Sequence, residues 1–166
     1  MKRLFLVLCL LACTCMIAYA GNKKKQKKAD EDTQNFRYEL EYIKSAGTGL
    51  ANVKVWSYSK KPHIAAEQTK KNAIHGVIFK GYAGSGATQP ALVRDAAGMA
   101  AHPEFFEAFF AEGGDYMRYV VNAVGTPEVM KVGKEYKVSQ IIQVNTAQLR
   151  KHLEQAGIIR GLASGF

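Results

Sequence analysis

The sequence predicts an α+β fold, in which an antiparallel sheet has helices packed on one of its faces. Three observations lead to this prediction. Residues 36–42 and 51–58 alternate apolar and polar side chains with the period of half-buried strands. Residues 63–80 repeat apolar side chains at helical spacing. Two alternating segments and a helix recur at residues 128–156, so the expected order is β-β-α, a two-helix insert at 91–124, then β-β-α.

The first two strands form a predicted hairpin. The first strand alternates apolar with charged residues, namely Phe36, Tyr38, Leu40 and Tyr42 against Arg37, Glu39 and Glu41. Residues 47–49, Gly-Thr-Gly, supply the turn. In the second strand, Val53 and Val55 point to one face, and Trp56 and Tyr58 point to the other.

A helix of about five turns is expected next. Pro62 fits its first turn, because an N–H there has no partner within the helix. Gly81 is the expected residue at its C-terminal end. Residues 82–90 are rich in glycine and are expected to form a loop.

The insert is expected to be helical. Residues 91–101 are small and weakly helical, and a stronger helix begins at Pro103. Asp115 is the expected N-cap of a further helix at 116–124, whose β-prone residues 119–121 weaken that assignment.

The last third of the domain is a predicted hairpin and helix. Residues 128–132 and 134–144 flank Gly133, and Thr146 is expected to cap a helix at 147–156. The apolar segment 158–166 is expected to pack onto the domain.

The N-terminus predicts export. Lys2 and Arg3 precede an apolar run at 4–18, which ends in Ala18-Tyr19-Ala20, the pattern of a secretory signal peptide. Two alternatives stay open, namely lipidation at Cys13 in the lipobox-like residues 10–13, and a signal anchor. Localisation in the periplasm, at the outer membrane or at the cell surface is therefore expected, with no transmembrane span in the mature chain.

The expected organisation is a signal peptide at 1–20, a flexible charged tether at 21–35 and one domain at 36–166. All three cysteines, Cys9, Cys13 and Cys15, lie in the signal peptide, so the mature domain needs no disulfide. The net charge of +9 is partly local, because five lysines lie in the tether, namely Lys23, Lys24, Lys25, Lys27 and Lys28. They suit a solvated leader or contact with an anionic surface, whereas nucleic-acid binding is not expected.

No motif predicts catalysis, a metal or a cofactor. The sequence Gly-Tyr-Ala-Gly-Ser-Gly at 81–86 lacks the lysine of a phosphate-binding loop. The histidines His63, His75, His102 and His152 have no metal-ligand spacing and are expected at the surface or as helix caps. Glu104 and Glu107 share a helix face, but carboxylates in a first helical turn usually complement the helix dipole.

Six aromatic residues are candidate contacts for a partner. The cluster of Phe105, Phe106, Phe109 and Phe110 is wider than one core stripe requires, and core packing is the competing interpretation. Trp56 and Tyr58 either cover the outer side of the sheet or provide a stacking platform for sugar or peptide.

The helix at 65–81 after a strand, and the strand followed by a short helix at 138–158, resemble a known pattern. The chain is similar to exported envelope proteins of the flagellar FlgT N-terminal and small flagellar-associated lipoprotein type, a group related to CsgG. It also resembles uncharacterised secreted proteins of Bacteroidetes. The resemblance implies a non-enzymatic role in binding or assembly at the envelope, with envelope proteins as partners. The alternative is a carbohydrate- or small-ligand-binding domain that uses residues 81–90 as a lid.

Overall fold

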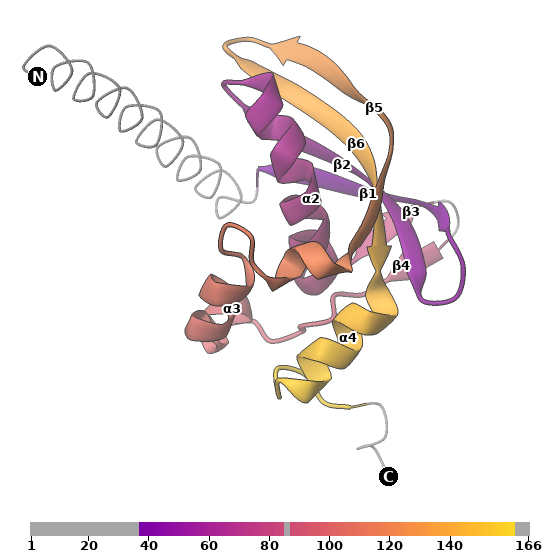
Figure 1. The fold of residues 1–166 in the computed structure, drawn as a ribbon, viewed down its shortest axis with the longest axis vertical. Coiled ribbons are helices and arrows are strands. Elements are labelled where there is room, and N and C mark those ends of the chain that lie inside the picture. Colours follow the sequence, from indigo (N-terminus) through magenta and orange to yellow (C-terminus); the bar gives the residue numbers. More distant parts are fainter. Residues whose placement is uncertain (1–36, 85–86, 162–166) are drawn as a thin grey trace, which may run out of the picture.

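The computed structural model describes residues 37–84 and 87–161 (Figure 1). The signal peptide, the tether, Cys13 and the lysines of residues 23–28 lie outside the described residues. The elements in chain order are β1 (Tyr38–Ser45), β2 (Leu50–Ser59), α2 (Pro62–Phe79), β3 (Tyr82–Gly84), β4 (Ala87–Gln89), η1 (Gly98–Ala101), α3 (Pro103–Phe109), η2 (Asp115–Tyr119), β5 (Val120–Val132), β6 (Glu135–Asn145) and α4 (Thr146–Gln155). Within the described ranges, no helix is both long enough and apolar enough to cross a membrane.

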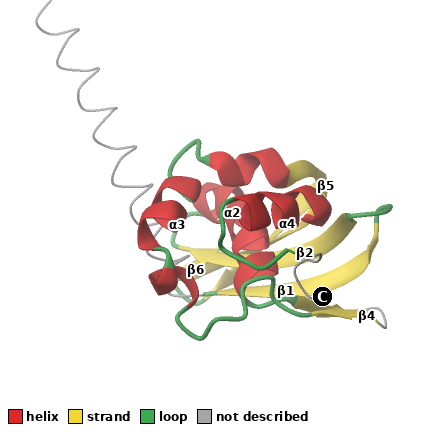
Figure 2. Cartoon of the chain, turned by 90° about the horizontal axis from the view of Figure 1, so that it is seen from below, coloured by secondary structure: helices red, strands yellow, loops and turns green. Residues whose placement is uncertain are grey.

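The main sheet has four antiparallel strands in the order β1-β2-β6-β5. The two hairpins meet at β2 and β6, which pair without interruption from Leu50 opposite Asn145 to Ser59 opposite Tyr136. Figure 2 shows the helices gathered on one side of this sheet. The predicted α+β class, with helices on one face of an antiparallel sheet, is confirmed.

Helix α2 lies across the covered face of the sheet, and 12 of its 18 residues are buried. Ile74 and Ile78 join the core that Val53, Val55 and Ile142 supply from β2 and β6. The predicted start of this helix is confirmed, whereas its C-cap is Lys80 and the predicted Gly81 is the next residue. Pro62 is its first residue, and the chain leaves it through Gly81, which has φ +72° and donates its N–H to the Gly76 carbonyl at 2.9 Å.

The insert closes over α2. Leu92 and Val93 are buried, and their N–H groups donate to the carbonyls of Val77 and Ile78 near the end of α2. Three phenylalanines of the α3 region and Tyr119 continue the core, which α4 completes through Leu149 and Leu153. Figure 1 shows that α4 lies beyond the end of β6, whereas α2 lies along the sheet.

The helix expected at 116–124 is wrong. Only a short 3₁₀ segment, η2, forms there, and β5 begins at Val120 because the β-branched residues pair with β6. The register of β5 shifts between Val124 and Glu128, so residues 125–127 form a bulge within one long strand. The glycine-rich segment 82–90, expected as a loop, contains the two-stranded hairpin of β3 and β4.

Two predicted helix caps are also wrong. The side chain of Asn145, not that of Thr146, accepts from the N–H of Gln148 at 3.0 Å. The Thr146 hydroxyl instead donates to the carbonyl of Gly49 at 2.9 Å, which joins α4 to the turn between β1 and β2. Asp115 is the first residue of η2, and Gly114 precedes it as the N-cap.

Candidate functional site

One face of the sheet has no described helix over it. We call this the open face. Strand alternation and register place on it Arg37, Glu39, Lys54, Trp56, Tyr58, Val124, Glu128, Met130, Val132, Glu135, Lys137, Ser139 and Ile141. Trp56 and Tyr58 are half-buried and lie opposite the buried Val53 and Val55, as the alternation of β2 predicts.

Three groups of charged and polar side chains cross the strands of the open face. The Lys137 ammonium donates to both carboxylate oxygens of Glu39 at 3.0 and 2.9 Å, and the Tyr58 hydroxyl donates to the same carboxylate at 2.5 Å. Hydrogen bonds from Tyr58 and then Lys137 hold the pKa of Glu39 below its usual value, so this carboxylate is ionised at neutral pH.

The second group links β6 to β2 and β5, and the third joins β6 to Arg37, the residue before β1. Glu128 accepts from Lys54 at 3.1 Å and from the Ser139 hydroxyl at 2.8 Å. Arg37 forms a two-pronged pair with Glu135. In each group an acidic side chain pairs with a basic side chain that is distant in the sequence. The charges of the open face are therefore balanced by their immediate neighbours.

Cations also lie over the two aromatic rings of the open face. The ammonium groups of Lys54 and Lys137 are 5.2 and 5.6 Å from the centre of the Trp56 ring. Lys137 and Arg37 lie 5.3 and 5.9 Å from the centre of the Tyr58 ring. These cation–π contacts occupy the ring surfaces that a stacking ligand needs.

The exposed large hydrophobic side chains gather on β5. Its exposed members, which we call the β5 strip, are 40% to 61% exposed and comprise Val121, Val124, Val129, Met130 and Val132. Met117, just before the strand, is exposed as well. The sequence does not predict this strip, because Asp115 suggests the start of a helix at 116–124 and the residues Gly-Thr-Pro at 125–127, which form the bulge, suggest a break in the chain. The run of β-branched residues was the available signal.

The phenylalanine cluster is largely interior. Phe106, Phe109 and Phe110 are buried, and the ring centres of Phe109 and Phe110 are 4.9 Å apart in an edge-to-face arrangement. The packing interpretation therefore fits these three residues. Phe105 is half-buried and stacks on Phe109, so it alone of the four keeps appreciable exposed surface.

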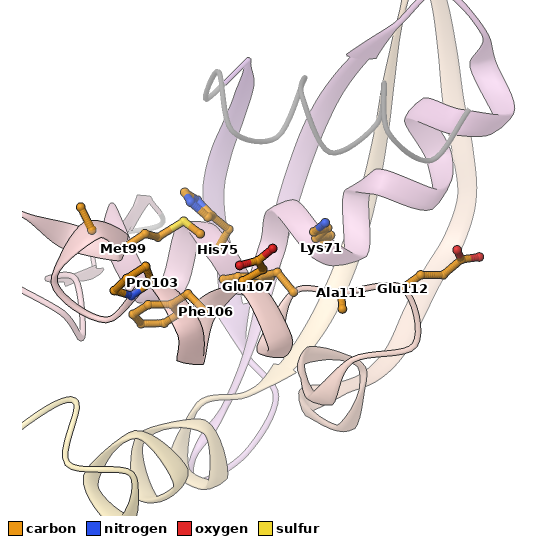
Figure 3. A pocket seen from close by; sticks show the side chains of 10 residues that line it. Lys71, His75, Met99, Pro103, Phe106, Glu107, Ala111 and Glu112 are labelled. Carbon is orange, nitrogen blue, oxygen red and sulfur yellow. The ribbon is translucent and has the colours of Figure 1, made fainter. Parts of the chain in front are cut away.

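A pocket of about 700 Å³ lies between α2 and the insert (Figure 3). Lys71 and His75 line it from α2, and Met99 lines it from η1. Phe106 and Phe110 contribute apolar surface from the α3 region. Pro103, Glu107, Ala111 and Glu112 are exposed residues at its rim.

His75 is a buried titratable group of this pocket, as Lys71 is, and the expectation of a surface or cap position is wrong for His75. The Tyr38 hydroxyl lies 2.6 Å from its Nδ1. Burial, then the positive charges of Lys80 and Lys71, lower the pKa of His75 to about 3. Burial raises the pKa of Tyr38, so a protonated phenol is hydrogen-bonded to Nδ1 of the neutral imidazole.

The other histidines vary in position. His63 is exposed, and His102 is the residue before the first turn of α3. His152 is half-buried among the rings of Phe105, Phe109 and Tyr119. Among the described residues, no group of three or more His, Cys, Asp and Glu side chains is arranged to hold a metal ion.

No family model matches this chain, and no curated protein or solved structure is significantly similar to it. The resemblance to envelope proteins of the FlgT N-terminal type therefore stays a prediction. Function has to follow from the open face, the β5 strip and the pocket.

Proposed function

We propose that this chain is an exported, non-enzymatic envelope protein whose domain binds a protein partner through the β5 strip. The observation that supports the proposal is the concentration of exposed apolar side chains on one edge strand. Single exposed hydrophobic residues are normal on a protein surface, whereas a group on one face marks an interaction site. Val124, Met130 and Val132 share the open face of β5, whereas Val129 pairs with the buried Val138 and faces the other side.

The surroundings of the strip suit a protein interface. Val124, Met130 and Val132 face the same side as the charged groups around Glu128 and Glu135. An apolar centre beside polar and charged residues is the usual composition of a protein–protein contact. The partner is expected to bury the apolar side chains and to leave the flanking ion pairs at the rim.

Carbohydrate binding, the alternative, has less support. A sugar would stack on Trp56 or Tyr58, but Lys54, Lys137 and Arg37 lie over these rings. The loop proposed as a lid is a β3–β4 hairpin that lies against β1. A Cβ at Gly84 would be only 2.4 Å from the carbonyl oxygen of Tyr42, so this hairpin is tightly seated on β1.

Export is supported by the sequence alone. Lys2, Arg3, the apolar run at 4–18 and Ala18-Tyr19-Ala20 form the pattern of a signal peptide. The chain has no cysteine after Cys15, so a disulfide framework is not required in an oxidising compartment. Attachment through Cys13 and contact of the lysines at 23–28 with an anionic surface remain proposals of the same kind.

The test is a photo-crosslinking amino acid placed in the full chain at Met130, with Lys151 of α4 as the matched exposed control. Crosslinking in intact cells is expected from position 130 and not from position 151. In a mild detergent extract, the native size is expected to exceed that of the single chain, and Met130→Asp is expected to reduce it to that of the single chain.

Met130→Asp should leave the domain folded, because surface substitutions usually change stability by less than about 0.5 kcal/mol. Thermal melting of the purified variant checks this. Equal crosslinking from both positions, or a native size that Met130→Asp leaves unchanged, would contradict a partner site on the β5 strip.

A further inference from the structure

The two edges of the main sheet differ in how they are covered. The β3–β4 hairpin lies against β1, where the rings of Tyr42 and Tyr82 stack with their centres 5.4 Å apart. Strand β5 forms the other edge, and among the described residues it pairs with β6 alone (Figure 1). The outer side of β5 therefore presents backbone N–H and C=O groups that suit pairing with a further strand.

We propose that the protein partner adds an extended strand to β5 along residues 128–132, and that this strand has apolar side chains on both faces and an acidic one beside Lys131. This binding mode rests on the proposed function, since it specifies how the partner contacts the β5 strip. In strand addition, main-chain hydrogen bonds along the edge supply affinity, and alternate side chains supply specificity.

The exposed apolar side chains of this segment lie on both faces of the sheet. Met130 pairs with Lys137 and lies on the open face, whereas Val129 pairs with the buried Val138 and faces the helix side. Met130 is 61% exposed and Val129 is 55% exposed. A partner packed on the open face would cover Met130 and leave Val129 in water. An added strand covers both, because its side chains alternate between the two faces.

The register of β5 marks where the added strand pairs. Pairing of β5 with β6 is regular along residues 128–132 and shifts between Val124 and Glu128. An irregular edge interrupts the ladder of hydrogen bonds that an added strand needs. The pairing segment is therefore 128–132, and Val121 lies on the far side of the shift.

Lys131 sets the charge of the partner strand. It is exposed, and it faces the same side as Val129. None of the ion pairs among the described residues includes Lys131. Opposite charges on neighbouring strands attract, so an acidic residue on the partner strand fits beside this lysine.

The first test compares aspartate substitutions on the two faces, with the native size of the full chain measured in a mild detergent extract. Val129→Asp and Met130→Asp should each lower the fraction of the chain in the complex by about tenfold or more, because each places an unpaired charge in the contact. Val121→Asp replaces a valine of similar exposure, 51%, and should leave this fraction unchanged. Thermal melting of the purified variants checks that all three are folded.

The second test concerns the charge. Lys131→Glu should lower the fraction in the complex by about threefold or more, because it places like charges side by side. Lys134→Glu, which reverses an exposed charge in the turn after β5, should not change it.

Two measurements cover the case in which Val129→Asp fails to fold. A photo-crosslinking amino acid at position 129 should capture the same partner in intact cells as one at position 130. In the isolated complex, amide hydrogen exchange should slow at alternate residues of 128–132, whose N–H groups face the added strand, and stay unchanged at Val121.

The outcomes separate this binding mode from the partner site itself. If Met130→Asp disrupts the complex and Val129→Asp does not, or if only position 130 captures the partner, strand addition is overturned and the partner site on the open face stands. Unchanged exchange at 128–132, or an equal loss with Val121→Asp, also overturns it. Equal losses with Lys131→Glu and Lys134→Glu would contradict the acidic residue. If neither aspartate at 129 nor aspartate at 130 changes the native size, the partner site on β5 fails as well.

Discussion

The two faces of the central strands differ in the interactions that their side chains make. On the covered face, Val53, Val55 and Ile142 are fully buried under α2. On the open face, the same strands carry Lys54, Trp56 and Lys137, whose contacts are ion pairs and cation–π interactions. Burial of apolar surface contributes most of the stability of a domain, whereas exposed ion pairs contribute little. The contacts of the open face are therefore able to rearrange on binding with little loss in the free energy of unfolding.

The sharpest test of this difference uses adjacent isoleucines of β6. Ile142 is fully buried, and Ile141 is half-buried on the open face opposite Lys54 and Val124. We expect Ile142→Ala to lower the free energy of unfolding by about 2–5 kcal/mol, because it removes buried methyl groups and leaves a cavity. Ile141→Ala should cost less than half as much. Urea denaturation of both variants measures the two values.

Equal losses for the two isoleucines would show that the open face is as tightly packed as the covered face. The proposed difference in stability between the two faces would then be wrong. An unchanged m-value in both variants is the control, since it shows that the denatured state has not altered.

The second prediction concerns pH and a group on the covered side. The pKa of His75 is about 3 in the folded protein and about 6.5 in the unfolded chain, so the unfolded chain alone binds a proton between these values. Stability should therefore fall as the pH falls from about 6.5 towards 3, by about 1.4 kcal/mol per pH unit from this group. In His75→Gln this part of the slope should disappear, although the variant is less stable at neutral pH.

Urea titrations of both proteins at several pH values from 7 to 4 measure the slope. Other titrating groups are common to the two proteins and serve as the internal control. The same slope in wild type and His75→Gln would mean that His75 is already accessible to protons in the folded state.

The smallest effect is expected on the open face. Glu39→Gln removes the charge that pairs with Lys137 but keeps an oxygen for the Tyr58 hydroxyl. Because Glu39 is exposed, the loss should be below about 1 kcal/mol and should shrink further at high salt. Because the pKa of Glu39 is lower in the folded protein than in the unfolded chain, its ionised carboxylate stabilises the fold at pH values above the unfolded pKa. This contribution to stability is lost only at acidic pH. A loss as large as that of Ile142→Ala would make the charged groups a principal source of stability.

Much of the fold follows from local patterns. Burial sets the alternation of apolar and polar residues in β2 and β6. It also sets the helical spacing of apolar residues between Pro62 and Gly81. The start of β5 was not predictable in the same way, because its pairing with β6 decides between helix and strand for residues 120–124. The Asn145 cap was missed because Asn and Thr are both common N-caps and stand side by side.

The candidate sites were less predictable than the fold. The sequence placed Trp56 and Tyr58 on the outer face but gave no sign that cations would lie over their rings, because Lys137 is distant in the chain. The pocket brings Lys71 together with residues 99–112, and no local pattern encodes such a contact. His75 carried no signal of burial, since histidine is common both inside and outside proteins.

The bulge of β5 has a consequence for the solubility of the protein at high concentration. An exposed, apolar edge strand is a template on which further chains add and grow into fibres. Here the bulge at 125–127 divides the edge into two short runs, and Pro127 has no N–H to offer to an added strand. The same strand is therefore able to present its side chains to one partner without serving as the seed of an open-ended polymer.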